Sequence, residues 1–324
     1  MKRFLSIACI CLLNQAMGED QAEIPQGLFS ESWMEVLMFD AKVGYSHTTM
    51  RREGDVVHTR IETTMTINRA GANVEMTSIE ASRESVDGKP LGFFSSLDLG
   101  NAPVRRKGLF KDGKIRVTSK QFGREQVIVH DFDQRGLMNW GLELLGRKHG
   151  QDKGTQYQAW VYAPEFGLDA PTKVTVKSHG EEEFQLRGKK TMGIKLVSTM
   201  HSEAGDVSIS SWLDKNGRPL RVTMEMVGIP IEMLATDRVT AMADFTPTDL
   251  FTQSLITIGQ EIPPDADTVI YQIIPKKGSK LDLEPEKNDF QKVRRLEGGG
   301  IEVTVKRANH NDLMKAKGHS AGLD

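Results

Sequence analysis

The chain has 324 residues, of which 38% are hydrophobic, and its 42 Lys and Arg residues nearly balance 44 Asp and Glu, for a formal net charge of −2. This length suffices for two or three ordinary domains, and the balanced charge excludes the wide basic field that nucleic-acid-binding proteins present. The basic clusters are short and dispersed, and we interpret them as solvated strand edges, where cations discourage aggregation. These clusters are Arg105-Arg106-Lys107, Lys189-Lys190, Lys276-Lys277 and Arg294-Arg295.

The N-terminus has the features of a secretory signal. A basic start and an apolar run at Phe4–Leu13 precede Ala16-Met17-Gly18, which supplies small residues for cleavage. We predict a signal peptide at residues 1–18 and an exported protein, periplasmic or extracellular. The run is too short to span a bilayer, so we expect no transmembrane segment after cleavage. Both cysteines, Cys9 and Cys11, lie in this segment, so we expect a mature chain without disulfides or thiolate chemistry.

The first half of the mature chain reads as a sheet followed by a helix. Residues 19–32 are polar and predict a leader. Alternating apolar and polar residues then predict a first β module over 33–133, as at His58–Ile67. A sheet whose strands are apolar on one face needs another element to bury that face. We predict that element, and the link to a second module, as a helix at 134–150, where leucines recur at helical spacing and Arg147-Lys148-His149 suits the negative end of the dipole.

A second β module is predicted at residues 151–244, because a turn of the first module is repeated there. Asp87-Gly88-Lys89-Pro90-Leu91 returns as Asn216-Gly217-Arg218-Pro219-Leu220. Each Gly supplies the positive φ of a tight hairpin, and each Pro fixes φ where the next strand starts. The sequence therefore predicts a mainly β fold of two related, antiparallel, curved-sheet modules, each half-barrel-like, joined by the helix.

The pattern changes after residue 244. Residues 245–306 predict a short helix at Leu250–Ile258 and a small third β unit. The strands expected in that unit are Thr268–Ile274, Lys280–Leu283, Phe290–Leu296 and Ile301–Lys306. Residues 307–324 are polar, lack periodicity and predict a disordered tail.

No pattern of catalytic, cofactor or metal chemistry stands out. The sequence has no His-Glu-x-x-His, P-loop, Gly-x-Ser-x-Gly or EF-hand pattern, so we expect no catalytic residue, cofactor or metal ion. Ser46 and His47 place a nucleophile beside a base. Because neighbours in a strand point to opposite faces, they are not expected to act together.

Three acidic groups favour structural roles. Asp131 with Asp133, and Asp265 with Asp267, flank the ends of predicted elements, where Asp caps or turns the chain more often than it binds a cation. Glu181-Glu182-Glu183 follows Gly180 and predicts a solvated hairpin end.

The aromatic residues leave two interpretations open. They could fill the core, or they could line an apolar groove between the modules that holds a lipid or acyl chain. The candidate groove residues are Trp140, Trp160, Tyr162, Phe166 and Trp212.

Several stretches resemble a known family. Trp33 to His47, the turn at Asp87–Leu91, Leu142–Gly150, Tyr157–Pro164 and the turn at Gly217–Leu220 resemble the β-rich N-terminal region of bacterial secreted transglutaminase-like proteins. The resemblance implies a papain-like domain, with Cys, His and Asp, after the β region. This sequence ends at Asp324, about where such a domain would begin, and offers no mature Cys, so no catalytic residue is carried over. Two alternatives follow: the chain is part of a longer protein with the catalytic domain after it, or it is a free-standing relative of the non-catalytic region.

The leading hypothesis for function is an exported, non-catalytic scaffold or accessory region that positions a substrate or protein partner for a transglutaminase-like activity. The hairpin pattern is also similar to that of periplasmic lipoprotein carriers, which cover a curved sheet with helices. The alternative is therefore a periplasmic carrier or binding protein for an apolar, lipid-like ligand. We expect no nucleic-acid partner.

Overall fold

The structure is a computed structural model that describes residues 24–69, 71–100, 103–164, 168, 170–202, 205–226, 228–247, 249, 258–275 and 290–307. It divides into two compact units, the first ending at Leu255 and the second starting at Ile256, and each is described by itself. The predicted signal peptide and most of the predicted tail lie outside the described residues.

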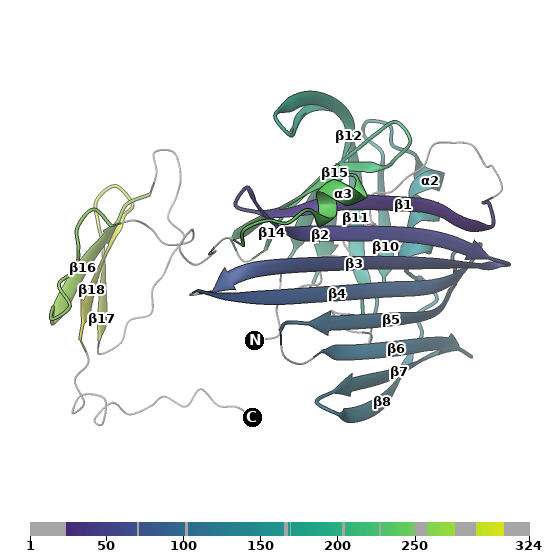
Figure 1. Cartoon of the computed structure of the whole chain (residues 1–324), viewed down its shortest axis with the longest axis horizontal. Helices are drawn as coiled ribbons and strands as arrows, with labels where there is room; N and C mark the ends of the chain where they lie inside the picture. Colours follow the sequence, from purple (N-terminus) through teal and green to yellow (C-terminus); the bar gives the residue numbers. More distant parts are fainter. Residues whose placement is uncertain are drawn as a thin grey trace. The chain divides into compact units, whose positions relative to one another are not determined.

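Unit 1 is built on one large sheet (Figure 1). Its strands are β1 (Gly27–Met38), β2 (Ala41–Glu53), β3 (Val56–Arg69), β4 (Ala72–Ser85), β5 (Pro90–Asp98), β6 (Val104–Lys111), β7 (Lys114–Gln121), β8 (Arg124–Asp131), β9 (Gly136–Leu137), β10 (Gln156–Val161), β11 (Thr172–Leu186), β12 (Lys189–His201), β13 (Val207–Leu213), β14 (Pro219–Met226) and β15 (Ile229–Thr236). Their order in the sheet is β8-β7-β6-β5-β4-β3-β2-β1-β15-β14-β13-β12-β11-β10-β9.

Two meanders share this sheet. The first runs outward from β1 to β8, and the second runs from β10 back to β15. They join where β1 pairs with β15, with Trp33 opposite Thr236 and Met38 opposite Ile231. The described pairs are antiparallel except β9 with β10. The predicted mainly β, antiparallel fold is confirmed, although the two expected modules are parts of one sheet.

The repeated turns are both hairpin turns with the same hydrogen bonds. The β4–β5 turn has Gly88 at φ 83°, and the Ser85 N–H donates to the Lys89 carbonyl. The β13–β14 turn has Gly217 at φ 76°, and the Asp214 N–H donates to the Arg218 carbonyl. In each case the Pro begins the next strand, as the sequence predicted.

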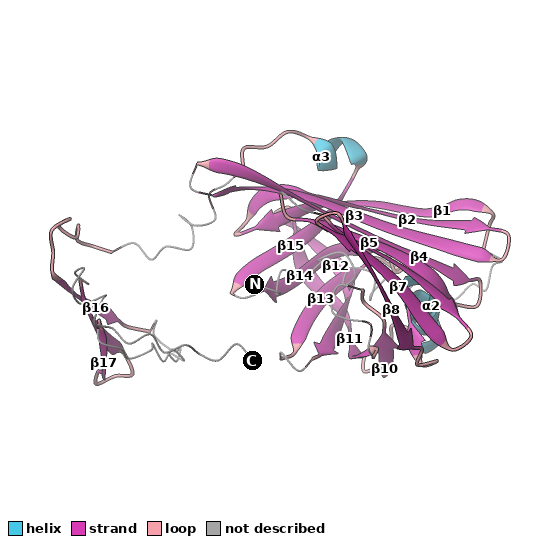
Figure 2. Ribbon diagram, turned by 90° about the horizontal axis from the view of Figure 1, so that it is seen from below, coloured by secondary structure: helices cyan, strands magenta, loops and turns pink. Residues whose placement is uncertain are grey.

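A helix and the short strand β9 lie between the meanders in the chain. Helix α2 (Asn139–His149) occupies only the later part of the range predicted as helix, because Gly136 and Leu137 pair with β10 as strand β9 instead. The helix packs against β3, β4, β9 and β10. Figure 2 shows α2 and a second helix, α3 (Arg238–Met242), on opposite sides of the first meander. We call the side of the sheet that α2 covers the inner face and the other side the outer face.

The inner face carries the core. One cluster combines Val36 and Val43 of the first meander with Val174 and Met233 of the second, all fully buried. A second cluster packs β5–β7 around Tyr162, and a third surrounds Trp140 of α2. Both meanders therefore bury their apolar residues together.

Two predicted boundaries need correction. Strand β1 begins at Gly27, inside the predicted leader, because residues 27–32 pair with β2. Glu181, Glu182 and Glu183 are not a hairpin end; they lie within β11, and the turn follows at Arg187-Gly188. The cause is a register shift between Ser178 and Gly180 that lets the strand continue past this glycine.

Unit 2 contains a three-stranded sheet in the order β16-β18-β17. Its strands are β16 (Thr268–Ile273), β17 (Gln291–Arg295) and β18 (Ile301–Lys306). They match three of the four strands expected in the third unit. The fourth, Lys280–Leu283, and nearly all of the predicted helix at Leu250–Ile258 lie outside the described residues.

Candidate functional site

Strands β6, β7 and β8 form the end of the first meander, and we call them the flange (residues 104–131). Two tight turns shape it. Asp112-Gly113 connects β6 to β7 and Phe122-Gly123 connects β7 to β8, and all four residues have positive φ. Such turns match the twist of antiparallel strands, which explains the two close hairpins.

Edge strand β8 is exposed on both sides. Its three central residues, Val127, Ile128 and Val129, are 43%, 41% and 54% exposed. Successive side chains in a strand alternate between the faces, so β8 shows apolar surface on each face. Proteins normally protect such edges, because unpaired backbone groups beside apolar side chains readily bind another strand.

The core ends one strand before this edge. Phe110, Ile115 and Val117 of β6 and β7 are buried on the inner face, in the cluster around Tyr162. Among the described strands of the sheet, β8 pairs with β7 alone. No described strand therefore lies along its other edge.

The outer face of the flange is rich in cations. Along β6 and β7, the residues that alternate with the buried Phe110 and Ile115 point outward, and six of them are exposed Lys or Arg. They are Arg105, Lys107, Lys111, Lys114, Arg116 and Lys120. Pairing places Arg105 directly opposite Lys120 and Lys111 opposite Lys114.

Sequence analysis missed this concentration, because the cations come from two strands that only pairing brings together. Within the dispersed cluster Arg105-Arg106-Lys107, the middle residue turns away and donates to the Pro164 carbonyl at 2.8 Å. Its neighbours face outward with Lys114 and Arg116. The alternation of basic residues in both strands was the available signal.

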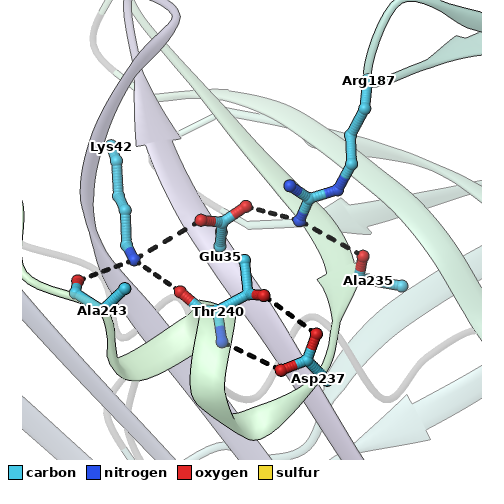
Figure 3. A network of polar contacts seen from close by, with 7 residues as sticks. All are labelled: Glu35, Lys42, Arg187, Ala235, Asp237, Thr240 and Ala243. Atoms are coloured by element: carbon cyan, nitrogen blue, oxygen red, sulfur yellow. Dashed lines mark hydrogen bonds and ion pairs between the residues drawn. The ribbon is translucent and has the colours of Figure 1, made fainter.

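A polar network fastens the outer face where the meanders join (Figure 3). Glu35 of β1 pairs with Lys42 at 3.4 Å and with Arg187 of the β11–β12 turn. Lys42 also donates to the carbonyls of Thr240 and Ala243, at 2.8 and 3.0 Å, and so holds the end of α3. These polar groups satisfy one another's hydrogen bonds and charges. The network therefore indicates an anchoring role for α3 and the β11–β12 turn.

A pocket of about 260 Å³ lies beside this network. Tyr45 and Thr64 of the sheet and residues 241–245 around the end of α3 line it. Nearby, His47 stacks on Trp33 with ring centroids 3.8 Å apart, and its Nε2 lies 2.8 Å from Glu31. Ser46 is buried on the inner face and bonds Thr63, so Ser46 and His47 face opposite sides as expected.

The aromatic groove residues lie in different surroundings. Trp140 is buried against β2 and β3, and Tyr162 is buried among Phe110 and other residues of the second cluster. Arg135 lies over Trp160 at 4.9 Å, and Trp212 is held between Lys195 and Arg221, each 5.0 Å from its ring. Phe166 lies outside the described residues. The structure does not bring the four described residues together.

Two acidic residues have clear structural partners. Asp133 accepts from the backbone and side chain of Arg135, and these bonds lower the pKa of its carboxyl to about 2. Asp131 pairs with Lys114 across the flange. Asp133 therefore turns the chain before β9, in line with the predicted role. Among the described residues, no His, Cys, Asp and Glu side chains gather as a metal site.

Glu84 is a buried acid that the sequence did not single out. Its two carboxylate oxygens accept the N–H groups of Trp140 and Gly141, each at 2.8 Å, and Ser82 donates to it at 2.6 Å. Met138, the residue before α2, provides no side-chain cap. Glu84 therefore caps the helix from β4, and its burial raises the pKa of the carboxyl to about 7.

Comparisons with known proteins give a distant likeness to a solved structure. No protein-family model and no curated protein matches the chain. A solved structure from Brucella abortus, described as a β-barrel-like protein of a domain of unknown function, DUF1849, is 14% identical. The match covers 66% of this chain and 98% of that one, with a TM-score of 0.49. Within the part of the chain that is described, no helix has the length and apolar character needed to cross a membrane.

Proposed function

We propose that this chain is an exported, non-catalytic accessory region that holds a protein partner by adding a strand of that partner to β8. The observation that carries the proposal is the exposed run Val127-Ile128-Val129 on an edge strand. Strand addition draws its affinity from backbone hydrogen bonds and its specificity from alternate side chains. As an edge strand, β8 offers backbone groups for the hydrogen bonds. Its side chains, apolar at the centre and charged at the ends, offer the specificity.

The proposed partner segment is extended, with apolar residues facing both sides of the sheet. Arg124 and Glu125 begin β8 and Asp131 ends it, so charges frame the apolar centre and favour one register. The resemblance to the N-terminal region of transglutaminase-like proteins supports an accessory role, in which the bound segment is presented to a catalytic domain. This context rests on the resemblance alone.

The matching turns support one further element of the proposal. The two meanders derive from one hairpin module used twice, with β4–β5 corresponding to β13–β14. The supporting facts are the equivalent hydrogen bonds at Ser85 and Asp214 and the Pro that starts each following strand.

A photo-crosslinking side chain at Val129, placed in the full chain in its producing cells, tests the strand addition. We expect a crosslink to one partner segment, with the amides of Arg124–Asp131 protected from hydrogen exchange in the complex. The variant Ile128→Lys should greatly reduce that crosslink, because a charge on the edge opposes pairing. A crosslinker at Met192, equally exposed on β12, is the matched control.

Three results would contradict the proposal. Equal crosslinking from Met192 would mean that contact is not specific to β8. A crosslinked partner without protected β8 amides would mean docking through side chains. A crosslink to a second copy of the chain would assign the edge to self-association.

The carrier hypothesis is less well supported by the described residues. Val36, Val174 and Met233 on the inner face are fully buried against other side chains of the core, where an apolar ligand would have to lie. Native mass spectrometry of the purified chain separates the two functions. A lipid bound at one molecule per chain would favour the carrier.

A further inference from the structure

We propose that the flange also binds the surface of an anionic phospholipid bilayer, through the tip at Phe122 and the cations of its outer face. This proposal concerns the face and tip of the flange, whereas strand addition concerns the edge of β8. The bilayer proposal and the strand-addition proposal are therefore tested by different experiments.

Phe122 is the first indication, because it occupies a position that the fold does not favour. It is 78% exposed in the β7–β8 turn and has φ 50°. A bulky residue in this conformation is strained, whereas Asn, Asp or Gly adopts it readily. The β6–β7 turn has the ordinary choice, Asp112 before Gly113. An exposed aromatic ring at a strained tip is costly for folding and suited to insertion between lipid head groups.

The cations of the outer face are the second indication. Arg105 lies directly opposite Lys120, and Lys111 lies directly opposite Lys114. Like charges facing each other across two strands destabilise a sheet. On β8, Asp131 pairs with Lys114 and Glu125 lies opposite Lys120, so one member of each pair has an acidic neighbour. No acid lies opposite Arg105 or Lys111 in the described strands, and a negatively charged surface would compensate this remaining positive charge. Lys120 and Arg124 flank Phe122, so charge and apolar contact coincide at the tip.

The arrangement fits a lipid surface better than a nucleic acid. The cations form a grid over two neighbouring strands, which matches a plane of phosphates more closely than a single line of them. On the same face, exposed Leu109 lies between the cations, and exposed Val127 and Val129 lie beside them on β8, between Glu125 and Asp131. Nucleic-acid surfaces use aromatic rings for base stacking, and the outer-face positions of β6–β8 are occupied by aliphatic, hydroxyl and charged residues.

Vesicle sedimentation with the full chain tests the proposal. We expect binding to mixed phosphatidylcholine–phosphatidylglycerol vesicles, little binding to pure phosphatidylcholine, and weaker binding at high salt. All variants share the same N-terminal segment, so differences between them report on the flange. Phe122→Asn should weaken binding about tenfold by removing the inserted ring. Arg105→Glu should weaken it about 30-fold by changing two charges near the surface.

Both variants are designed to leave the fold intact or make it more stable. Asn suits the conformation of residue 122, and a Glu at position 105 would face Lys120 as an opposite charge. Reduced binding together with unchanged or raised thermal stability would therefore support the proposal. Lys189→Glu, at the exposed start of β12 beside the β11–β12 turn, is the control that should bind like the parent.

Several outcomes would overturn the proposal. One is parental binding by both Phe122→Asn and Arg105→Glu. Another is equal binding to charged and uncharged vesicles. Tighter binding to duplex DNA than to the mixed vesicles, lost in Arg105→Glu, would assign the cations to nucleic acid instead.

Discussion

At the residue scale, Glu84 shows how one buried side chain links two elements. It lies on β4 and receives the first N–H groups of α2, 56 and 57 positions later in the chain. A helix start without its own cap leaves donors that need an acceptor. Burial disfavours the charged carboxylate, while the three hydrogen bonds favour it, and burial has the larger effect on the pKa.

The raised pKa of Glu84 predicts a pH dependence of stability. Because the folded chain binds this proton more tightly than the unfolded chain, the contribution of Glu84 falls as pH rises from about 4.5 to about 7. Glu84→Gln should cost about 1–3 kcal/mol at pH 5, since one amide oxygen replaces two acceptors. The difference from the parent should shrink at pH 8, where the parent carries the buried charge.

Urea unfolding of the parent and Glu84→Gln at the two pH values measures this difference. Glu75→Gln, at an exposed position of the same strand, should behave like the parent at both. A gap between parent and Glu84→Gln that stays the same or widens at pH 8 would show that the burial of this carboxyl does not govern its titration.

At the element scale, α2 reaches the β4–β5 turn through two glycines. A Cβ on Gly141 would lie 2.7 Å from the Gly88 carbonyl oxygen, and a Cβ on Gly88 would lie 2.8 Å from the Gly141 Cα. Both distances are too short for a side chain. The repeated turn that the sequence revealed therefore also seats the helix in the first meander.

Gly141→Ala separates this packing from helix propensity. Propensity alone would stabilise α2 by about 1 kcal/mol, because Ala replaces Gly inside a helix. The clash with the Gly88 carbonyl should instead lower the melting temperature by several degrees, as overpacking costs about 1–3 kcal/mol. Thermal unfolding followed by circular dichroism gives the sign. A higher melting temperature would show that the turn moves aside freely.

Local signals predicted these elements well, and contacts between them poorly. The pattern of Gly and Pro predicted both repeated hairpins, and leucine spacing predicted α2, although it extended the helix over the residues of β9. The cap at Glu84 and the cations opposite each other on β6 and β7 depend on pairing register, which alternation within one strand does not determine. Gly180 illustrates the limit, since its bulge lets β11 continue where a turn was expected.

At the scale of the whole molecule, the pairing of β1 with β15 makes unit 1 a single sheet with a shared core. We therefore predict that the two meanders unfold together. Val222→Ala, at a fully buried position of β14, should cost about 1–3 kcal/mol. Native-state hydrogen exchange should show the same loss of protection in β3 of the first meander as in β12 of the second.

The strands of unit 2 provide an internal comparison for that experiment. Protection of β16 and β18 should stay at the parental level, because they belong to the other compact unit. Loss confined to β10–β15 would mean that the meanders fold separately, as the sequence alone suggested. The sequence predicted two modules because nothing local marks Trp33 and Thr236 as neighbours.

The pairing of β1 with β15 also sets an order of events during synthesis. Trp33 leaves the ribosome about 200 residues before Thr236, its partner. Until then, the nascent first meander has an unpaired edge at β1 in addition to the one at β8. Contacts this distant in the chain form slowly, and open edges invite aggregation meanwhile. A chain delivered through a membrane would gain from chaperones that shield β1 until its last partner strand emerges.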